Sequence, residues 1–213
     1  MCFSVDEELF FRLTMLVLLS AFGGIRAYYE RKVKKIDPEL RKKRFRLSGS
    51  KYERKRDTVL QDMLAIGWAI PMLLYIAYPP WRAWSAIPLP TPIWVIVIGV
   101  ILAVLSLVLL VWTHRTLGVF WTFKLEIRPK HKLVTWGPYY RIRHPMYTAS
   151  LIFMFATGMI AADWLILVVS ALTLLIINKR IDGEEKMMLD HFGKEYRDYM
   201  QRSRRLLPRL RRK

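Results

Sequence analysis

The segment Ile93–Trp112 restricts the possible folds of this chain more than any other feature, because it contains no charged residue. A helix needs about 20 apolar residues to cross the hydrocarbon core of a bilayer, and this segment reaches that length. Val59–Tyr78 is equally long, and three shorter apolar segments are Leu9–Ile25, Tyr147–Ala162 and Trp164–Asn178. A soluble protein with buried core helices is the alternative interpretation, and the uncharged segment argues against it.

These segments predict an all-α, polytopic integral membrane protein with five transmembrane helices. Asp163 divides the last two segments, which are short, so we expect them to form a tight helical hairpin against the longer helices. Asp6, Glu7 and Glu8 precede the first segment, where a cleavable signal peptide would carry positive charge. We therefore expect the first segment to remain as a helix.

Lys and Arg residues are distributed unevenly between the apolar segments. There are 14 in Arg26–Thr58, seven in Thr113–Met146 and 12 in Lys179–Lys213, whereas Pro79–Pro92 contains Arg82 alone. Basic loops stay in the cytoplasm, which predicts an N-terminus outside and a cytoplasmic C-terminus. The net charge of +18 then lies where anionic lipids attract it. We expect a lipid bilayer as the partner and no nucleic acid, because no zinc-finger or RNA-binding motif is present.

Several common classes of site are absent from the sequence. A single cysteine, Cys2, excludes an internal disulfide and any multi-cysteine metal site. The four histidines are too scattered to indicate a metal site by their spacing, so we expect none. The chain also lacks the dinucleotide fingerprint, the Gly-x-Ser-x-Gly elbow and the His-Glu-x-x-His pair.

One candidate cluster directly precedes the fourth apolar segment. Pro145 suits the first turn of a helix, and it keeps His144 out of helical geometry. The free N–H groups and the positive dipole end of such a helix start form a natural anion site. We expect Arg141, Arg143 and His144 to reinforce it. A basic and aromatic collar beside the membrane is the alternative.

A second cluster follows the fifth apolar segment. If that helix continues beyond the bilayer, Arg180 and Glu184 share one face, although a weak surface ion pair is the alternative. The two clusters lie at the cytoplasmic ends of adjacent helices, where their charges can converge. Such a mixture suits a zwitterionic cofactor that carries an ammonium, a carboxylate and a sulfonium. The residues that follow at helical spacing predict a cytoplasmic amphipathic helix that could lie on the bilayer and cover the site: Leu189, Phe192, Tyr196 and Tyr199.

Several motifs recur in order with intact spacing between Phe120 and Pro208. They are His-x-Leu-Val, Gly-x-Tyr, Arg-His-Pro-x-Tyr, an acidic pair, Phe-Gly-x-x-Tyr-x-x-Tyr and a terminal proline, at His131–Val134, Gly137–Tyr139, Arg143–Tyr147, Glu184–Glu185, Phe192–Tyr199 and Pro208. This pattern resembles the isoprenylcysteine carboxyl methyltransferase family, integral membrane enzymes related to phospholipid N-methyltransferases.

The resemblance implies an S-adenosylmethionine-dependent methyltransferase that acts on a lipophilic, prenylcysteine-like carboxylate. It divides the chain into N-terminal transmembrane helices with a basic cytoplasmic loop, residues 1–113, and a catalytic half, residues 114–213. By position, the implied cofactor contacts are His131, Lys132, Leu133, Val134, Tyr139, His144, Pro145, Met146, Tyr147 and Glu184. Arg180 would bind the methyl acceptor.

Three other functions remain open at this stage. A phospholipid or small-amine N-methyltransferase on the same scaffold needs a base to accept a proton, and Glu185 is the nearby candidate. An NADPH-dependent sterol-type reductase has a similar C-terminal region, but its motif tyrosine follows Asn and precedes Gly-Glu, whereas Met146, Thr148 and Ala149 stand here. A non-enzymatic membrane protein would use the charges only as ion pairs.

Overall fold

The computed structural model describes residues 5–36, 55–78, 92–120 and 132–208. Within these ranges the chain forms helices and no strand, apart from a single parallel bridge between Ile142 and Arg204. The α-helices are α1 (Val5–Ile36), α3 (Lys55–Ala77), α5 (Ile93–Leu117), α6 (Pro145–Ala161), α7 (Trp164–Phe192) and α8 (Lys194–Arg202). The two short 3₁₀ helices are η2 (Gly118–Phe120) and η3 (Gly137–Tyr140). Each of the five apolar segments lies on a helix, and the all-α prediction is confirmed for the described residues.

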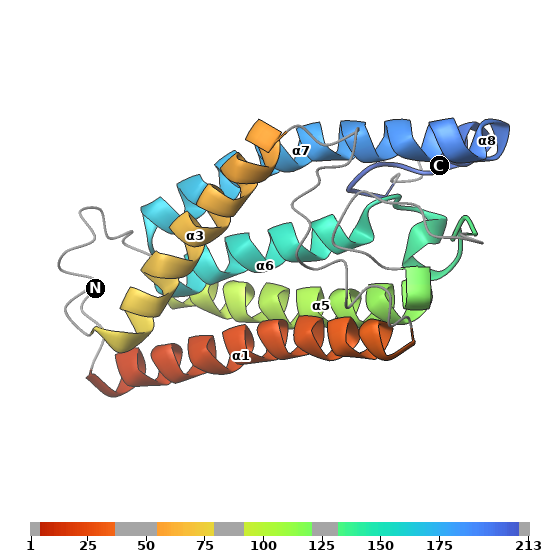
Figure 1. Ribbon diagram of the computed structural model, residues 1–213. Helices are drawn as coiled ribbons and strands as arrows, with labels where there is room; N and C mark the ends of the chain where they lie inside the picture. The colour runs from red at the N-terminus through yellow and green to blue at the C-terminus, as the bar shows by residue number, and fades with distance from the viewer. Residues whose placement is uncertain (1–4, 37–54, 79–91, 121–131, 209–213) are drawn as a thin grey trace, which may run out of the picture.

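The five long helices form a bundle in which α6 is central (Figure 1). Helix α6 packs against α1, α3, α5 and α7, and α5 is its most extensive neighbour. Most of its residues are buried, including Leu151, Phe153 and Ile160. Helices α1, α5, α6 and α7 run side by side, while α3 crosses them obliquely and packs on α7.

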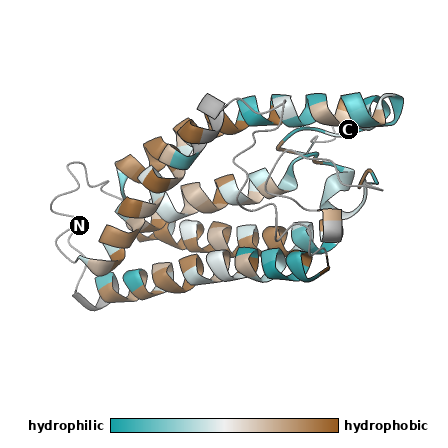
Figure 2. Ribbon diagram, viewed as in Figure 1, coloured by the Kyte–Doolittle hydropathy of each residue, from teal (hydrophilic) through white to brown (hydrophobic). Residues whose placement is uncertain are grey.

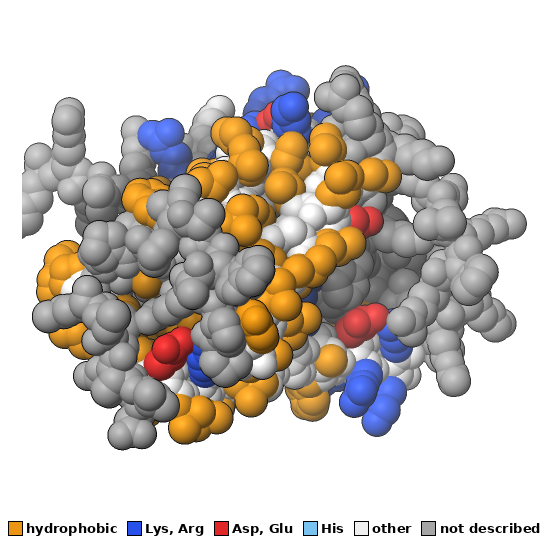
Figure 3. Space-filling model, turned by 90° about the vertical axis from the view of Figure 1, so that its left-hand side faces the viewer, with side chains coloured by type: hydrophobic (Ala, Val, Ile, Leu, Met, Phe, Trp, Pro, Cys, Tyr) orange, Lys and Arg blue, Asp and Glu red, His pale blue; other side chains and the backbone are white. Residues whose placement is uncertain are grey.

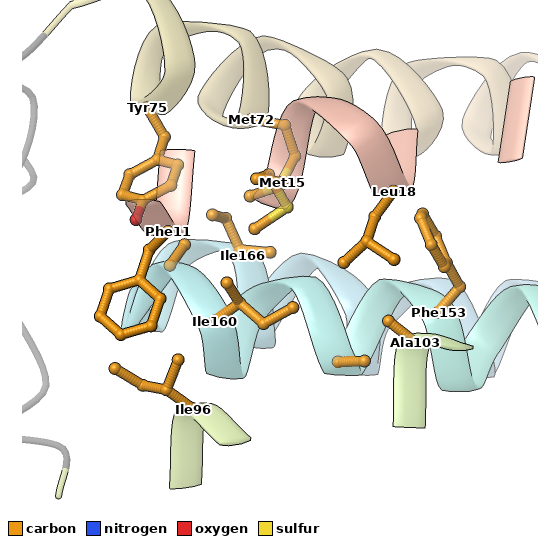
Figure 4. Packing of buried hydrophobic residues seen from close by; sticks show 12 residues of the cluster. Phe11, Met15, Leu18, Met72, Tyr75, Ile96, Ala103, Phe153, Ile160 and Ile166 are labelled. Atoms are coloured by element: carbon orange, nitrogen blue, oxygen red, sulfur yellow. The ribbon is translucent and has the colours of Figure 1, made fainter. Parts of the chain in front are cut away.

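The main apolar core lies toward one end of the bundle and receives side chains from all five long helices (Figure 4). Met15 of α1 and Tyr75 of α3 are fully buried there, together with Ile96 of α5, Ile160 of α6 and Ile166 of α7. Lipid tails are as apolar as these side chains, so close packing, rather than transfer out of water, stabilises such a core in a bilayer.

The outer surface of the bundle is also apolar. The exposed fractions of Val17, Leu73, Val108 and Leu175 are 67%, 62%, 60% and 60%. Figure 2 shows hydrophobic residues along much of α1, α3, α5 and α7, and Figure 3 shows that they predominate among the coloured residues at the end opposite α8. Soluble monomers rarely expose apolar surface of this extent, so the bundle is a membrane protein.

Among the described residues, three helices are long and apolar enough to cross a membrane: Glu8–Ile36, Ile93–Leu117 and Trp164–Phe192. The apolar part of α3, Asp62–Ala77, and the whole of α6 are shorter. The predicted number of five membrane crossings therefore stays a prediction.

The connection between α6 and α7 is made by Ala162 and Asp163. Ala162 adopts a left-handed conformation, and the Asp163 carboxylate caps α7 by accepting hydrogen bonds from the backbone N–H groups of Leu165, at 2.8 Å, and Ile166, at 3.4 Å. Helix α7 continues beyond its apolar segment, from Asn178 to Phe192, and the predicted tight hairpin in the membrane stays a prediction. This extension carries Arg180 and Glu184 on one continuous helix, as the second cluster required.

Two glycines set how closely the central helices approach. A Cβ atom on Gly99 of α5 would lie 3.0 Å from the Ala156 carbonyl oxygen and 3.0 Å from Ile160 on α6. A Cβ on Gly158 of α6 would lie 2.6 Å from Leu167 on α7. Small residues at these contacts allow the helix backbones to approach one another, as in many membrane bundles.

We predict that Gly99→Ala destabilises the protein by about 1–3 kcal/mol, because the added methyl group overpacks the contact between α5 and α6. The measurement is thermal unfolding in detergent micelles. The matched control is Gly67→Ala on α3, where a Cβ meets nothing within 4 Å. Alanine favours helix over glycine, so the control is expected to be neutral or slightly stabilising, and equal effects at the two sites would contradict the packing model.

Candidate functional site

Charged and polar side chains gather at one end of the bundle. The C-terminal parts of α1, α5 and α7 and the start of α6 lie together at this end, on the right in Figures 1 and 2, and α8 lies beyond α7. Both clusters predicted from the sequence lie here, so the structure brings them together.

The start of α6 has the predicted local geometry. Pro145 occupies the first turn, and His144 is the N-cap residue with φ −123° and ψ 56°, outside helical geometry. His144 is buried, and so is Pro145. The His144 backbone N–H donates to the carbonyl of Arg205 at 3.0 Å. This hydrogen bond fixes the position of His144 against the C-terminal segment of the chain, to which Arg205 belongs.

Arg180 and Glu184 of α7 face Tyr147 and His144 of α6. The Arg180 Nε donates to the Tyr147 hydroxyl at 2.9 Å, and Glu184 interacts electrostatically with that hydroxyl. Glu184 Oε2 lies 3.8 Å from His144 Nδ1. Four of the residues predicted by the resemblance therefore form one connected cluster across two helices.

One carboxylate oxygen of Glu184 receives no hydrogen bond from the described residues. Its Oε2 atom is buried and has no hydrogen-bond partner among the described residues, although the side chain as a whole is 30% exposed. An unsatisfied buried carboxylate oxygen costs free energy, which a cationic donor group of a ligand would relieve.

Glu185 is bound very differently from its neighbour. Its side chain is 4% exposed and accepts from Arg143 Nε at 2.8 Å and from Arg205 Nη2 at 2.8 Å. His144 Nε2 lies 3.4 Å from the same carboxylate. Three groups from two other parts of the chain thus surround Glu185, which is an arrangement suited to holding the fold together.

Arg143 was expected to reinforce an anion site, and protein acceptors occupy its Nε and Nη1 atoms. In addition to Glu185, the guanidinium donates from Nη1 to the carbonyls of Ser203 at 2.6 Å and Met200 at 3.2 Å. Arg141 is exposed. Of the three groups expected to reinforce the anion site, His144 alone is both buried and directed at the cluster.

The segment after α8 runs beside the residues that precede α6. Backbone hydrogen bonds join Arg143 N–H to the Arg204 carbonyl at 2.7 Å and Arg204 N–H to the Arg141 carbonyl at 3.0 Å. One helical turn further on, the Thr148 hydroxyl donates to the Leu206 carbonyl at 2.6 Å. The C-terminal segment therefore forms one wall of the charged end.

The amphipathic stripe predicted for the C-terminal helix is partly buried inside the protein. Gly193, with φ 54°, separates α7 from α8, and Tyr196 and Tyr199 are each only 2% exposed. The Tyr199 hydroxyl donates to the Tyr139 carbonyl at 2.5 Å, and burial raises the pKa of Tyr199 to about 12. The expectation that these tyrosines lie on the bilayer is wrong, because they pack against η3 and the charged end.

The remaining predicted contacts are distributed around this cluster. Tyr139 is buried, and burial together with nearby Glu184 raises its pKa well above the usual value, so its phenol stays protonated. Val134 is buried, Leu133 and Met146 are half-buried, and Lys132 is exposed. His131 lies outside the described residues. Within those residues, no group of three or more His, Cys, Asp or Glu side chains could hold a metal ion.

Sequence reasoning missed three residues at this end of the bundle. Arg26 of α1 interacts electrostatically with Tyr147 and Arg180. His114 of α5 is 1% exposed and stacks on Tyr29 of α1, with ring centroids 4.7 Å apart. The available signal was the spacing of Phe22, Arg26 and Tyr29, which places a charged residue between two aromatic residues on one helix face.

These observations define the class of the protein: an all-helical membrane fold with a charged site at the ends of its helices. Residues 94–195, from the start of α5 into α8, match the family described as phospholipid methyltransferase. A probable protein-S-isoprenylcysteine O-methyltransferase of rice (Oryza sativa subsp. indica) is 32% identical over 114 residues, which cover 52% of this chain and 60% of that protein.

Protein-S-isoprenylcysteine O-methyltransferase B of Arabidopsis thaliana is 30% identical over 116 residues, covering 51% of this chain and 57% of that protein. The chain thus spans less than two thirds of the length of these relatives. The structure of a eukaryotic intramembrane Ras methyltransferase, isoprenylcysteine carboxyl methyltransferase, matches with a TM-score of 0.54 and 21% identity, over 90% of this chain and 67% of that one.

These matches confirm the predicted resemblance to the isoprenylcysteine carboxyl methyltransferase family and its phospholipid methyltransferase relatives. The match to the family covers α5, α6, α7 and the beginning of α8, which carry Tyr147, Arg180 and Glu184. Helices α1 and α3 lie outside it, although the fold likeness extends over 90% of the chain.

We predict that Glu185→Ala destabilises the protein by about 3–5 kcal/mol, because it leaves the buried Arg143 guanidinium without its carboxylate. The free energy of unfolding in detergent measures the loss. Asp182→Ala is the matched control on the same helix, since Asp182 also pairs with Arg205, at 2.7 Å, but is 60% exposed. We expect it to cost about 1 kcal/mol or less, and comparable losses in the two variants would contradict a structural role for Glu185.

Proposed function

We propose that this protein is an integral membrane methyltransferase that uses S-adenosylmethionine to methylate the carboxylate of a lipophilic, prenylcysteine-like acceptor at the cytoplasmic surface. The similar plant proteins bear the name of that activity, and the fold is that of a membrane methyltransferase. The observation that carries the proposal is the placement of Arg180 and the unsatisfied Glu184 one helical turn apart, both against Tyr147.

The described residues fit the proposed cofactor. Glu184 Oε2 offers a buried acceptor to an ammonium group, while His144 and the positive dipole end at the start of α6 suit a carboxylate. The predicted cofactor contacts that remain among the described residues are Lys132, Leu133, Val134, Tyr139, Pro145, Met146 and Tyr147. When bound, S-adenosylmethionine supplies a methyl group that its sulfonium has already activated.

Arg180 is proposed to hold the acceptor carboxylate. A guanidinium can fork onto carboxylate oxygens, and the hydrogen bond to Tyr147 fixes the orientation of Arg180. An ionised carboxylate already carries the electron pair that forms the new bond, so it needs no general base. Positioning of the acceptor and exclusion of water then account for much of the rate.

The alternative function, transfer to an amine, has less support from the site. An amine acceptor must lose a proton, and Glu185 was the candidate base. The Glu185 carboxylate is buried and already accepts from Arg143 and Arg205, which keeps it from a reacting amine. Glu185 is therefore proposed as a positioning residue that fixes His144 and the start of α6.

The proposed orientation keeps the five predicted membrane crossings, with the N-terminus outside and the C-terminus cytoplasmic. The basic stretches follow α1, α5 and α7, whose C-terminal ends lie at the charged end of the bundle (Figure 2). The positive-inside rule places that end in the cytoplasm. We propose the same division of the chain as before, with residues 1–113 as a transmembrane part and residues 114–213 as the catalytic half.

We predict that Glu184→Ala abolishes S-adenosylmethionine binding, while expression and membrane insertion stay normal. The change removes the carboxylate that pairs with the ammonium group. Isothermal titration calorimetry on purified protein measures the affinity, and Asp182→Ala, on the exposed side of the same helix, is the control. An unchanged affinity in Glu184→Ala would overturn the assigned site.

Arg180→Ala is expected to retain S-adenosylmethionine binding and to lose turnover, because the acceptor carboxylate loses its partner. Methyl transfer from labelled cofactor to prenylcysteine analogues and extracted lipids, analysed by mass spectrometry, measures turnover and separates a methyl ester from an N-methyl product. Lys179→Ala, at the exposed neighbouring position, serves as the control. Wild-type turnover in Arg180→Ala would show that the acceptor binds elsewhere, and an N-methyl product would support the alternative function.

A further inference from the structure

Helix α5 presents one continuous apolar stripe on the outer surface of the bundle. Six exposed residues follow one another along it at alternating spacings of four and three: Trp94, Ile98, Ile101, Leu105, Val108 and Trp112. Residues at these spacings lie on one face of a helix. A single lipid-facing stripe therefore runs along α5, with a tryptophan at each end.

The two tryptophans mark the limits of this apolar stripe. Trp112 comes eighteen residues after Trp94, a distance of about 27 Å along an α-helix. The hydrocarbon core of a bilayer is about 30 Å thick, and tryptophan is enriched where this core meets the headgroups. One turn beyond Trp112, the same helix face carries the exposed Arg115 in place of an apolar residue. The stripe therefore leaves the hydrocarbon core near Trp112.

The 3₁₀ helix η3 packs on α5 at this level. A Cβ atom on Gly137 would lie 2.9 Å from the Thr116 hydroxyl oxygen and 3.4 Å from Trp112 Nε1, and the φ of Gly137 is 61°. A larger residue at this position would meet both a steric and a conformational obstacle. Glycine therefore allows the backbone next to Trp136 to lie against Trp112.

Helix η3 directs its two adjacent tyrosines differently. Tyr139 is buried, and its carbonyl accepts from the Tyr199 hydroxyl, whereas Tyr140 is 64% exposed. Trp136, directly before η3, is 57% exposed. Aromatic side chains with an apolar ring and a polar edge suit the boundary between lipid and water. Trp112, Trp136 and Tyr140 thus continue the lipid-facing stripe of α5 at the charged end of the bundle.

Positive charge adjoins these aromatic residues. Arg115 and Arg141 are exposed, and Arg141 directly follows Tyr140. The two segments that carry these residues, 112–120 and 132–143, contain no Asp or Glu. The order from the bundle centre outward is apolar, then aromatic, then basic, which matches the layers of a bilayer with an anionic surface. Both the continuity with the lipid-facing stripe and the charge therefore favour lipid over a protein partner.

We propose that Trp112, Trp136 and Tyr140 with Arg115 and Arg141 form a collar that binds the anionic phospholipid headgroups of the surrounding bilayer. The three aromatic side chains lie at the boundary between hydrocarbon and headgroups, and the two guanidinium groups pair with lipid phosphates. The collar thereby fixes how deep the charged end lies in the membrane.

The collar also separates two interpretations of the stretch before α6. The sequence allowed either an anion site or a basic and aromatic collar, and the structure assigns different residues to each. His144 is buried and directed at the charged cluster, whereas Trp136, Tyr140 and Arg141 are exposed. Lipid binding by the collar does not depend on methyl transfer, so it is tested without turnover.

The first test measures the depth of the collar in vesicles of phosphatidylcholine and phosphatidylglycerol. Cys2→Ser removes the single natural thiol, and a nitroxide label is attached to Trp136→Cys or Tyr140→Cys. Val108→Cys, on the lipid-facing stripe, and Asp198→Cys, on the exposed face of α8, are the references for hydrocarbon and water. Electron paramagnetic resonance compares the access of oxygen and of a water-soluble nickel complex to each label.

We expect both collar labels to lie between the two references, at the depth of the lipid phosphates. Nickel access equal to that at Asp198→Cys would place the collar in water and overturn the proposal. Protection from both oxygen and nickel would show that a second copy of the chain or another protein covers this surface, which also overturns it.

The second test measures the preference for anionic lipid in a neutral detergent. Phosphatidylglycerol should raise the unfolding temperature of the wild type at lower concentration than phosphatidylcholine does. We expect Arg115→Gln combined with Arg141→Gln to raise the half-effective phosphatidylglycerol concentration roughly 5- to 25-fold, since each basic residue contributes about a factor of five at an anionic surface. Lys194→Gln combined with Arg197→Gln removes the same charge from exposed positions of α8 and should match the wild type.

Equal losses in the two double variants would show that net charge alone attracts the lipid, and they would overturn the collar. The labelled chains of the first test keep both Arg115 and Arg141. If the arginine double variant does not fold, the depth measurement therefore still decides the proposal.

Discussion

The geometry of the charged end depends on the buried carboxylate of Glu185. A buried charge is tolerated only where opposite charges and hydrogen bonds surround it, and here Arg143 and Arg205 both donate to it. Arg143 directly precedes His144 and Pro145, whereas Arg205 belongs to the C-terminal segment. One side chain of α7 therefore holds the start of α6 and the end of the chain in a fixed relation.

The two adjacent acids of α7 have opposite environments because a helix turns about 100° per residue. Glu185 faces the two arginines, while Glu184 faces Tyr147 and His144 and keeps an oxygen without a partner among the described residues. Within this acidic pair, Glu185 therefore stabilises the structure, and Glu184 offers an acceptor to a ligand. A rotation of α7 that released Glu185 would also move Glu184 and Arg180, so the ligand-facing residues depend on the structural one.

Local rules sufficed for the features that neighbouring residues determine. They include the five helices, the helix start at Pro145, the non-helical His144 and the shared face of Arg180 and Glu184. Contacts between distant segments were not predictable in this way. No sequence pattern distinguishes the buried Glu185 from Glu184. Nor does the sequence show that Tyr199 contacts Tyr139 instead of the bilayer, because a helix that packs on the protein and a helix that lies on a membrane need the same apolar spacing. Arg26 was hidden for a related reason, since it begins a stretch with 14 Lys and Arg residues and looked like any other basic loop residue.

Helix α1 is attached to the rest of the bundle by other contacts than those that join α6 and α7 at the charged end. The groups assigned to the cofactor, Glu184 and His144, belong to the segment that matches the family, and His144 Nε2 lies 3.4 Å from Glu185. Arg26 belongs to α1, which is fixed to that segment by stacked rings at Phe22 and Tyr29 and not by the Glu185 network. Helix α1 is therefore attached to α5 and α6 through aromatic rings, whereas the start of α6 is attached to α7 through buried charges. The two attachments share no residue, so a substitution in one leaves the contacts of the other in place.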